Sequence, residues 1–270
     1  MPLTVLNYHS VRNNGELPLS VAVRSFRWQM QHIANKGYRC VSLEEGFYKE
    51  NGKDRRTIPL TFDDGYLDNY TEAFPILLEL GFTATFFVTA EFIEHRIIPW
   101  HKRPGQGEAM SWGNLREMAR AGMRVGSHTL SHSRLSEIPA AEAMRELVES
   151  RVMIEQRLGA QVLSFAYPSG DFTKEVMGMV PEAGYAMAAA LALPPGLMED
   201  RYSIPRMGIS VRDGRWRYRL KISGAFCPMP VQQMVNFRQR FFNGTKMKKK
   251  MEKLENAQKM HRNGKIRGES

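Results

Sequence analysis

The sequence predicts an α/β domain in which parallel strands alternate with helices, as a barrel or an open sheet. Apolar runs of strand length recur, and segments with helical periodicity follow them. Glycine follows most helical segments, where a chain leaves a helix in the left-handed conformation. About seven such units without an internal repeat favour one barrel-like domain over residues 1–211, with a doubly wound sheet as the alternative.

The positions of the elements follow from these runs. Strands are expected at residues 3–8, 57–62, 82–89, 123–126, 162–167, 185–191 and 203–209. Helices are expected from an N-cap at Ser25 to Gly37, at residues 73–80, 114–121 and 140–158, and in a short segment before Gly184. Gly159 is expected to close the longest of them.

Composition limits the class of protein. The 270 residues are 43% hydrophobic and 24% charged, which is typical of a globular domain and excludes a disulfide-stapled miniprotein, a disordered chain and a membrane bundle. Cys40 and Cys227 lack metal-type spacing, so a bound metal would need His and carboxylate ligands. The first residues show no basic leader, and we expect a cytoplasmic protein.

The net charge of +10 belongs to the C-terminal quarter, since residues 1–200 carry net −4 and residues 201–270 net +14. From Arg212 on, arginines alternate with aromatic residues, and a Lys-rich stretch begins at Lys246. We expect residues 212–270 to form a basic, aromatic-containing appendage and a tail. One interpretation is a solvated charge run, and the other is peripheral binding to anionic lipid at the inner membrane face. Nucleic-acid binding is less favoured.

Candidate reactive residues stand at the ends of expected strands, where the loops of a barrel converge on one face. Asp63 and Asp64 follow one strand, and His128 and His132 follow another. Taken singly, the acidic pair can be a turn and the histidines can be hydrogen-bonded packing. Together, one Asp and two His supply the three ligands of a catalytic zinc-type site with a position open to water. The spare carboxylate can take a proton from that water, which is the chemistry of amide or ester hydrolysis.

Three stretches resemble, in order and spacing, the first three motifs of the NodB-homology polysaccharide deacetylases. They are TFDDGY at residues 61–66, SHTLSH at 127–132 and FAYPSG at 165–170. The resemblance covers about residues 3–210. It implies a distorted (β/α)7 barrel and the metal-dependent removal of N-acetyl groups from hexosamine-containing glycans.

The resemblance also implies a role for each matching residue. Asp63 is expected to be the general base, and the backbone N–H of Tyr167 is expected to stabilise the oxyanion. The expected metal ligands are Asp64, His128 and His132. Zinc is the first expectation for the divalent metal, and this ligand set also accepts Co, Ni, Mn or Fe.

Two features depart from the family pattern. The late Leu-x-His motif of many relatives is absent, because the only histidine after His132 is His261. The early YHSV at residues 8–11 resembles instead the poly-N-acetylglucosamine deacetylase branch, which implies that His9 is the general acid. The third motif lacks the arginine that keeps the catalytic Asp ionised in many relatives, and we expect Arg206 to take that place.

Aromatic residues near the strand ends are candidates for contact with sugar rings. The expected substrate-binding residues are Tyr66, Trp112, Tyr167 and Pro168, with Trp100 and His101 beside them. The alternative for the tryptophans is a place in the lid of the core. The expected substrate is an acetylated aminosugar glycan or a lipid-linked sugar. A related deformylase acting on an amide C–N bond and an inactive glycan-binding relative are the alternative functions.

Overall fold

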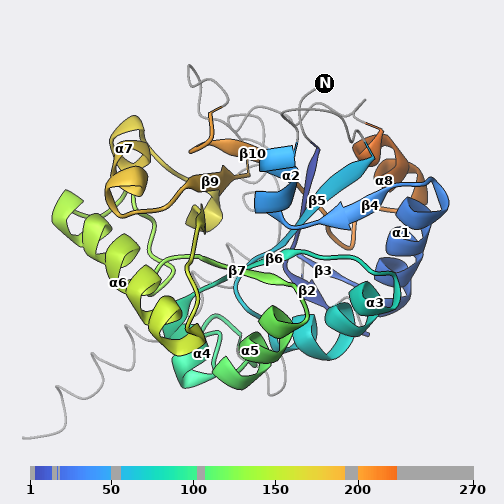
Figure 1. The fold of residues 1–270 in the computed structure, drawn as a ribbon, viewed down its shortest axis with the longest axis horizontal. Coiled ribbons are helices and arrows are strands. Elements are labelled where there is room, and N and C mark those ends of the chain that lie inside the picture. Colours follow the sequence, from blue (N-terminus) through green and yellow to red (C-terminus); the bar gives the residue numbers. More distant parts are fainter. Residues whose placement is uncertain are drawn as a thin grey trace, which may run out of the picture. The chain divides into compact units, whose positions relative to one another are not determined.

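Seven parallel strands close into a barrel in the computed structural model, which describes residues 4–13, 17, 19–49, 56–101, 107–191 and 200–223 (Figure 1). They are β1 (Val5–Tyr8), β5 (Thr57–Phe62), β6 (Thr85–Val88), β7 (Arg124–Ser127), β8 (Ser164–Ala166), β9 (Met187–Ala190) and β10 (Ile204–Gly208). Neighbours pair in the order β1-β10-β9-β8-β7-β6-β5, and β1 also pairs with β5, with Asn7 opposite Thr61. The seven predicted strands are these strands, so the (β/α)7 barrel is confirmed and the open sheet is wrong.

Three short strands were not predicted. β4 (Arg39–Val41) pairs in parallel with the first half of β5, and β2 (Ser10–Val11) pairs in parallel with β3 (Ser20–Val21) in a separate two-stranded sheet. Strands of two or three residues are too short to show an alternating pattern. The β2–β3 sheet follows β1 directly and therefore lies next to the end of the barrel where β1 and β5 finish.

Helices surround the barrel (Figure 1). They are α1 (Val23–Asn35), α2 (Leu43–Lys49), α3 (Phe74–Glu79) after a π-helical turn at Asn69–Ala73, α4 (Ala90–His95), α5 (Trp112–Arg120), α6 (Ala140–Leu158), α7 (Lys174–Glu182) and α8 (Arg215–Ile222). Gly159 ends α6 with a φ of 67°, as predicted. The predicted N-cap at Ser25 is wrong, because the N-cap is Ala22, three residues earlier, and the Ser25 N–H donates to the carbonyl of Ala22 within the first turn of α1. Among the described residues, no helix is long and apolar enough to cross a bilayer.

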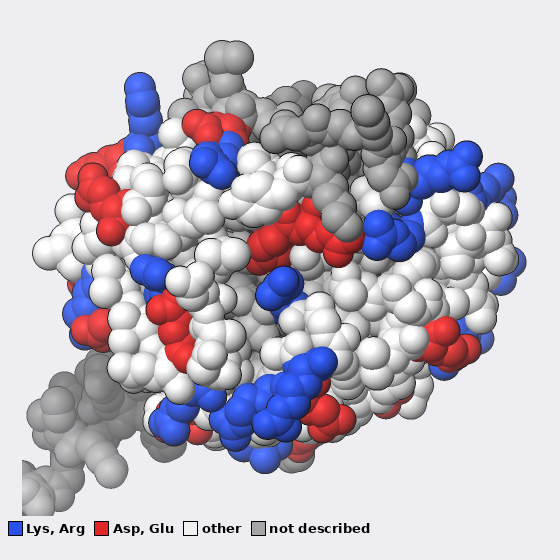
Figure 2. All heavy atoms as spheres, in the orientation of Figure 1, with Lys and Arg blue, Asp and Glu red and all other residues white. Residues whose placement is uncertain are grey.

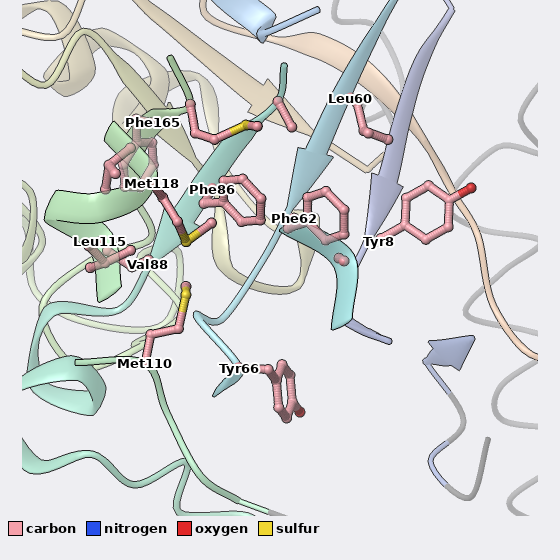
Figure 3. Close-up of a cluster of buried hydrophobic side chains, with 14 of the residues drawn as sticks. Tyr8, Leu60, Phe62, Tyr66, Phe86, Val88, Met110, Leu115, Met118 and Phe165 are labelled. Carbon is pink, nitrogen blue, oxygen red and sulfur yellow. The ribbon is translucent and has the colours of Figure 1, made fainter. Parts of the chain in front are cut away.

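Two apolar layers build the core. Outside the barrel wall, the rings of Phe62 and Phe86 stack at 4.6 Å, and Tyr8 stacks on Phe62 at 5.6 Å (Figure 3). Inside the barrel, apolar side chains meet Leu43 of α2; they are Val5, Phe87, Ala166, Met187, Ala189 and Ile204. Gly126 makes room for the Phe87 ring, since a Cβ there would lie 2.5 Å from it. The barrel interior is therefore packed, and it offers no channel at this level.

A polar layer lies above the apolar one, at the carboxyl ends of the strands. Side chains alternate along a strand, so Asn7 and Arg206 face the interior on the same side as Val5 and Ile204. Thr61 donates its hydroxyl to Asn7 Oδ1 at 2.9 Å, and Arg206 donates to the same oxygen at 3.0 Å. This buried polar layer lies directly below the candidate site.

Candidate active site

Asp63 and Asp64 stand where β5 turns out of the barrel. The Asp63 N–H still donates to the carbonyl of Tyr8, whereas Asp64 and Gly65 have φ values of 74° and 80°. A left-handed backbone at a non-glycine residue is held only by surrounding contacts and is common at functional sites. Here the Gly65 carbonyl accepts the N–H of Met110, and a Cβ at Gly65 would lie 2.8 Å from Ile93. The turn sends the two neighbouring carboxylates in different directions.

The structure brings Asp64, His128 and His132 together. One ligand atom from each lies within 4.8 Å of the others. Asp64 Oδ1 is 3.6 Å from His128 Nε2 and 3.3 Å from His132 Nε2. Atoms bound tetrahedrally to zinc at about 2.0–2.1 Å stand about 3.4 Å apart. The donor set and its spacing therefore fit a divalent metal ion.

The protonation of the cluster also fits a metal. His128 Nδ1 lies 2.7 Å from the carbonyl of Ala166, which can only accept, so this nitrogen carries the proton and Nε2 has a lone pair. Burial lowers the pKa of His128 to about 4, which keeps the ring neutral at physiological pH. Burial raises the pKa of Asp64, but the hydrogen bond with His132 and the attraction of the neighbouring histidines when they are protonated outweigh it and hold that pKa below its ordinary value. A neutral imidazole and an ionised carboxylate are the forms that bind metals.

Glu146 of α6 holds the loop that carries His132. Its Oε2 accepts the backbone N–H groups of Leu130 and Ser131 at 2.9 Å each, and its Oε1 accepts the Ser131 hydroxyl at 2.6 Å. Thr129 and His132 in this loop have φ values of 66° and 68°, a conformation that needs such support. Glu146 is buried, so these donors are what compensate its charge.

We expect Glu146→Gln to weaken the binding of added Zn²⁺ by about 10- to 100-fold, as the loss of a group that holds a metal ligand in place commonly does. A glutamine offers one acceptor oxygen in place of two, so part of the loop loses its support. Competition with a chromogenic chelator measures the affinity. Glu149→Gln is the matched control, because Glu149 lies on the same helix, exposed, with Arg145 at 4.0 Å. Equal affinities of the two variants would show that the loop keeps its shape without Glu146.

Asp63 is held by a buried arginine. Arg206 Nη1 donates to Asp63 Oδ1 at 2.7 Å and Nη2 donates to Oδ2 at 2.9 Å, while Asn7 Nδ2 donates to Oδ2 at 3.0 Å. Burial raises the pKa of Asp63, but the charge of Arg206 overcomes this and holds that pKa well below its ordinary range. Arg206 of β10 thus contacts the Asp63 carboxylate, which is the contact that we expected for it.

His9 lies on the same side of the site. Its Nε2 is 4.0 Å from Asp63 Oδ2, and its side chain is 12% exposed. Its Nδ1 is buried and has no hydrogen-bond partner among the residues that the structure describes. The His9 carbonyl accepts the Asn69 side-chain amide, which fixes the backbone at this point. The ring is therefore close enough to share a small substrate group with Asp63.

Aromatic residues form one rim of the cluster. Trp100 Nε1 donates to the hydroxyl of Tyr66 at 3.2 Å, and the same hydroxyl forms a hydrogen bond with His101 Nε2 at 2.7 Å. The Trp100 ring lies 4.8 Å from the His132 ring and is 43% exposed, whereas Tyr66 is buried beneath it. Trp100 is thus the member of this group that offers an open ring face beside a metal-ligand candidate.

Trp112 does not join this group. Its ring N–H donates to Glu94 at 2.7 Å, and the guanidinium of Arg157 lies 5.9 Å from its centroid. The ring is 9% exposed at the start of α5. These contacts connect α5 with α4 and α6. They favour the alternative that Trp112 covers the core over a role in binding sugar.

Tyr167 and Pro168 are buried at the end of β8. The Tyr167 ring stacks on Phe172 at 4.3 Å, and its hydroxyl donates to the carbonyl of Tyr202. Its N–H donates to the carbonyl of Ala189 at 3.1 Å, which extends the β8–β9 pairing by one residue. This hydrogen bond contradicts the prediction that the Tyr167 N–H is available to an oxyanion, because the donor is already used.

Comparison with known proteins identifies the family. The sequence model of the family described as polysaccharide deacetylase matches residues 50–188, just over half of the chain. YxkH of Bacillus subtilis (strain 168), named for the same family, is 25% identical over 213 residues, which cover 77% of this chain and 71% of that protein. The poly-beta-1,6-N-acetyl-D-glucosamine N-deacetylase of Staphylococcus aureus (strain MSSA476) is 25% identical over 234 residues, covering 76% of this chain and 78% of that protein.

A solved structure shows the same fold. The Streptococcus pyogenes deacetylase PplD in complex with acetate superposes with a TM-score of 0.70 and 22% identity, over 82% of this chain and 98% of that one. The class is thus a NodB-type (β/α)7 barrel hydrolase. The chain belongs to the polysaccharide deacetylase family. The matched residues include Asp63, Asp64, His128 and His132, whereas His9 and Arg206 lie outside them.

Proposed function

We propose that this protein is a metal-dependent hydrolase that removes N-acetyl groups from the hexosamine residues of a glycan. One observation carries the proposal: a buried carboxylate held ionised by Arg206 adjoins an Asp-His-His cluster with the spacing of metal ligands. A base beside a bound divalent ion can catalyse amide hydrolysis at neutral pH.

Asp64, His128 and His132 would hold the ion. Bound there, a divalent ion supplies Lewis acidity, which polarises the acetyl carbonyl and lowers the pKa of water. Asp63 takes the proton of the attacking water, and Oδ1 is the better acceptor because it receives one hydrogen bond where Oδ2 receives two. His9 gives its proton to the amide nitrogen as the C–N bond breaks. The products are acetate and a free amine.

Two observations support a sugar substrate. Trp100 offers an exposed ring beside His132, and aromatic faces commonly pack against the apolar faces of sugars. The Staphylococcus aureus relative is named for poly-β-1,6-N-acetylglucosamine. We therefore propose β-1,6-linked N-acetylglucosamine as the first substrate to test, free or attached to a lipid carrier.

The presence of both His9 and Arg206 argues against an inactive glycan-binding relative. An inactive relative would be expected if the absent late Leu-x-His histidine and the absent third-motif arginine had no replacement in this chain. His9 lies 4.0 Å from Asp63, and Arg206 forms two hydrogen bonds with it, so both chemical functions have a candidate in this chain.

The test is acetate release from N-acetylglucosamine oligomers by the full chain loaded in turn with Zn²⁺, Co²⁺, Ni²⁺, Mn²⁺ or Fe²⁺. We expect acetate and free amine in equal amounts, and loss of both on chelation. Formate from an N-formyl substrate without acetate from the acetylated one would identify a deformylase instead. Binding of the oligomers without any product, whatever the metal, would show an inactive relative.

A further inference from the structure

The outer face of α8 exposes an apolar pair that nothing in the described structure covers. Trp216 is 67% exposed and Leu220 is 42% exposed. They stand four residues apart and so lie side by side on one face of the helix. We call them the α8 ridge. Tyr218 and Lys221, on the opposite face, are buried.

Arginines flank the α8 ridge on both sides. At 100° per residue, Arg215 and Arg219 fall on one side of Trp216 and Leu220, and Arg217 falls on the other. Lysine and arginine side chains gather along the edge of the molecule where α1 and α8 lie (Figure 2). Asp213 is the only acidic residue in residues 209–223, and it pairs with Lys221 at 2.8 Å and Arg217 at 3.7 Å.

The helix is fixed on the barrel, so the ridge is presented in one orientation. Lys221 Nζ also donates to the carbonyl of Gly208 at 2.6 Å, which joins α8 to the end of β10. Tyr218 packs edge-on against Trp28 of α1 at 6.0 Å, and its hydroxyl donates to the carbonyl of Gln29 at 3.5 Å. Trp216 and Leu220 are therefore exposed on a helix that contacts with β10 and α1 hold in place.

We propose that the α8 ridge docks this protein onto the surface of an anionic lipid bilayer. Tryptophan favours the membrane interface, and an apolar ridge between cations is typical of helices that lie in it. Basic side chains near the surface are attracted to anionic headgroups, and the sequence after α8 adds eleven Lys and Arg against three Glu in residues 224–270. A nucleic acid would engage the arginines but would leave Leu220 without a contact. This proposal is independent of the deacetylase activity.

Vesicle flotation tests the proposal with the full chain. We expect the protein to float with phosphatidylglycerol-containing vesicles and not with phosphatidylcholine alone. Trp216→Ser combined with Leu220→Ser should lower the bound fraction by about tenfold, because the apolar part of the contact is lost. Leu78→Ser is the control, since Leu78 is an apolar residue that is 46% exposed on a different helix, α3. Equal flotation of the double variant and wild type overturns the proposal, because the basic tail would then suffice.

Two further measurements keep the result unambiguous. Trp216→Phe keeps the ridge apolar, so it should still float but should lose the blue shift of tryptophan emission that vesicles cause in the wild type. An unchanged blue shift would mean that Trp216 does not enter the interface, which also overturns the proposal. Binding of double-stranded DNA that is lost in Arg217→Glu, without any flotation of the wild type, would identify a nucleic-acid surface instead.

Discussion

Asp63→Asn is expected to lower kcat by about 10²- to 10⁴-fold while the bound metal is retained. The amide has the shape of the carboxylate but cannot take a proton from water. The metal-ligand set of Asp64, His128 and His132 is unchanged by the substitution. Acetate release and metal content, measured on the same samples, separate loss of the base from loss of the ion.

The folded fraction has to be measured alongside, because Arg206 loses its counter-charge in this variant. Asn7→Ala is an informative companion: it removes one donor to Asp63 Oδ2 but keeps the carboxylate, so a smaller loss of kcat is expected. Wild-type activity in Asp63→Asn would remove Asp63 as the base. Loss of the metal in that variant would instead place Asp63 among the ligands.

The barrel could be predicted because its strands are apolar runs bounded by turn-forming residues. β4 and β2 were missed because their pairing depends on where β5 and β3 come to lie, which a stretch of two or three residues does not encode. The N-cap at Ser25 failed for a related reason. The helix already begins at Val23, before Ser25, and no side chain caps it, so no capping residue in the sequence marks its start.

The site was predictable where its residues follow one another in motifs, and less so where they come from other elements. Asn7 was missed although it is a polar residue on the inward face of an apolar strand, which is a detectable signal. Glu146 likewise shares the buried face of its helix with Ala143 and Ser150. The hydrogen bond from the Tyr167 N–H to the Ala189 carbonyl depends on how far the pairing of β8 and β9 extends, and no local sequence pattern reveals that extent.

Arg206→Gln is expected to reduce the free energy of unfolding by about 3–5 kcal/mol at neutral pH, the usual cost of removing one partner of a buried ion pair. The Arg206 side chain is 0% exposed and that of Asp63 is 2% exposed, so water cannot replace the guanidinium. Asn7 alone remains as a side-chain donor to the carboxylate. We expect acetate release to fall as well, because Asp63 is no longer held ionised in position.

The pH dependence distinguishes a lost charge partner from lost packing. In the wild type, the pKa of Asp63 lies below its ordinary value of 3.8, so its contribution to stability is present above that pH and is lost as pH falls towards the folded-state pKa. Without Arg206, the largest of the effects that oppose burial is lost, and we expect the pKa of Asp63 to rise above the ordinary value. The pH dependence of the Asp63 contribution to stability then reverses its sign, and the variant loses stability as pH rises from about 4 to about 7.

Urea denaturation at about pH 4.5 and about pH 7, with a chelator to exclude metal effects, measures this difference. The difference in the free energy of unfolding between wild type and Arg206→Gln should be larger at the higher pH. Arg134→Gln is the matched control, because Arg134 and its partner Glu137 are about half exposed and such pairs contribute about 1 kcal/mol or less. A gap that stays constant with pH would mean that Arg206 acts through packing, and Asp63 would then need another explanation for its ionised state.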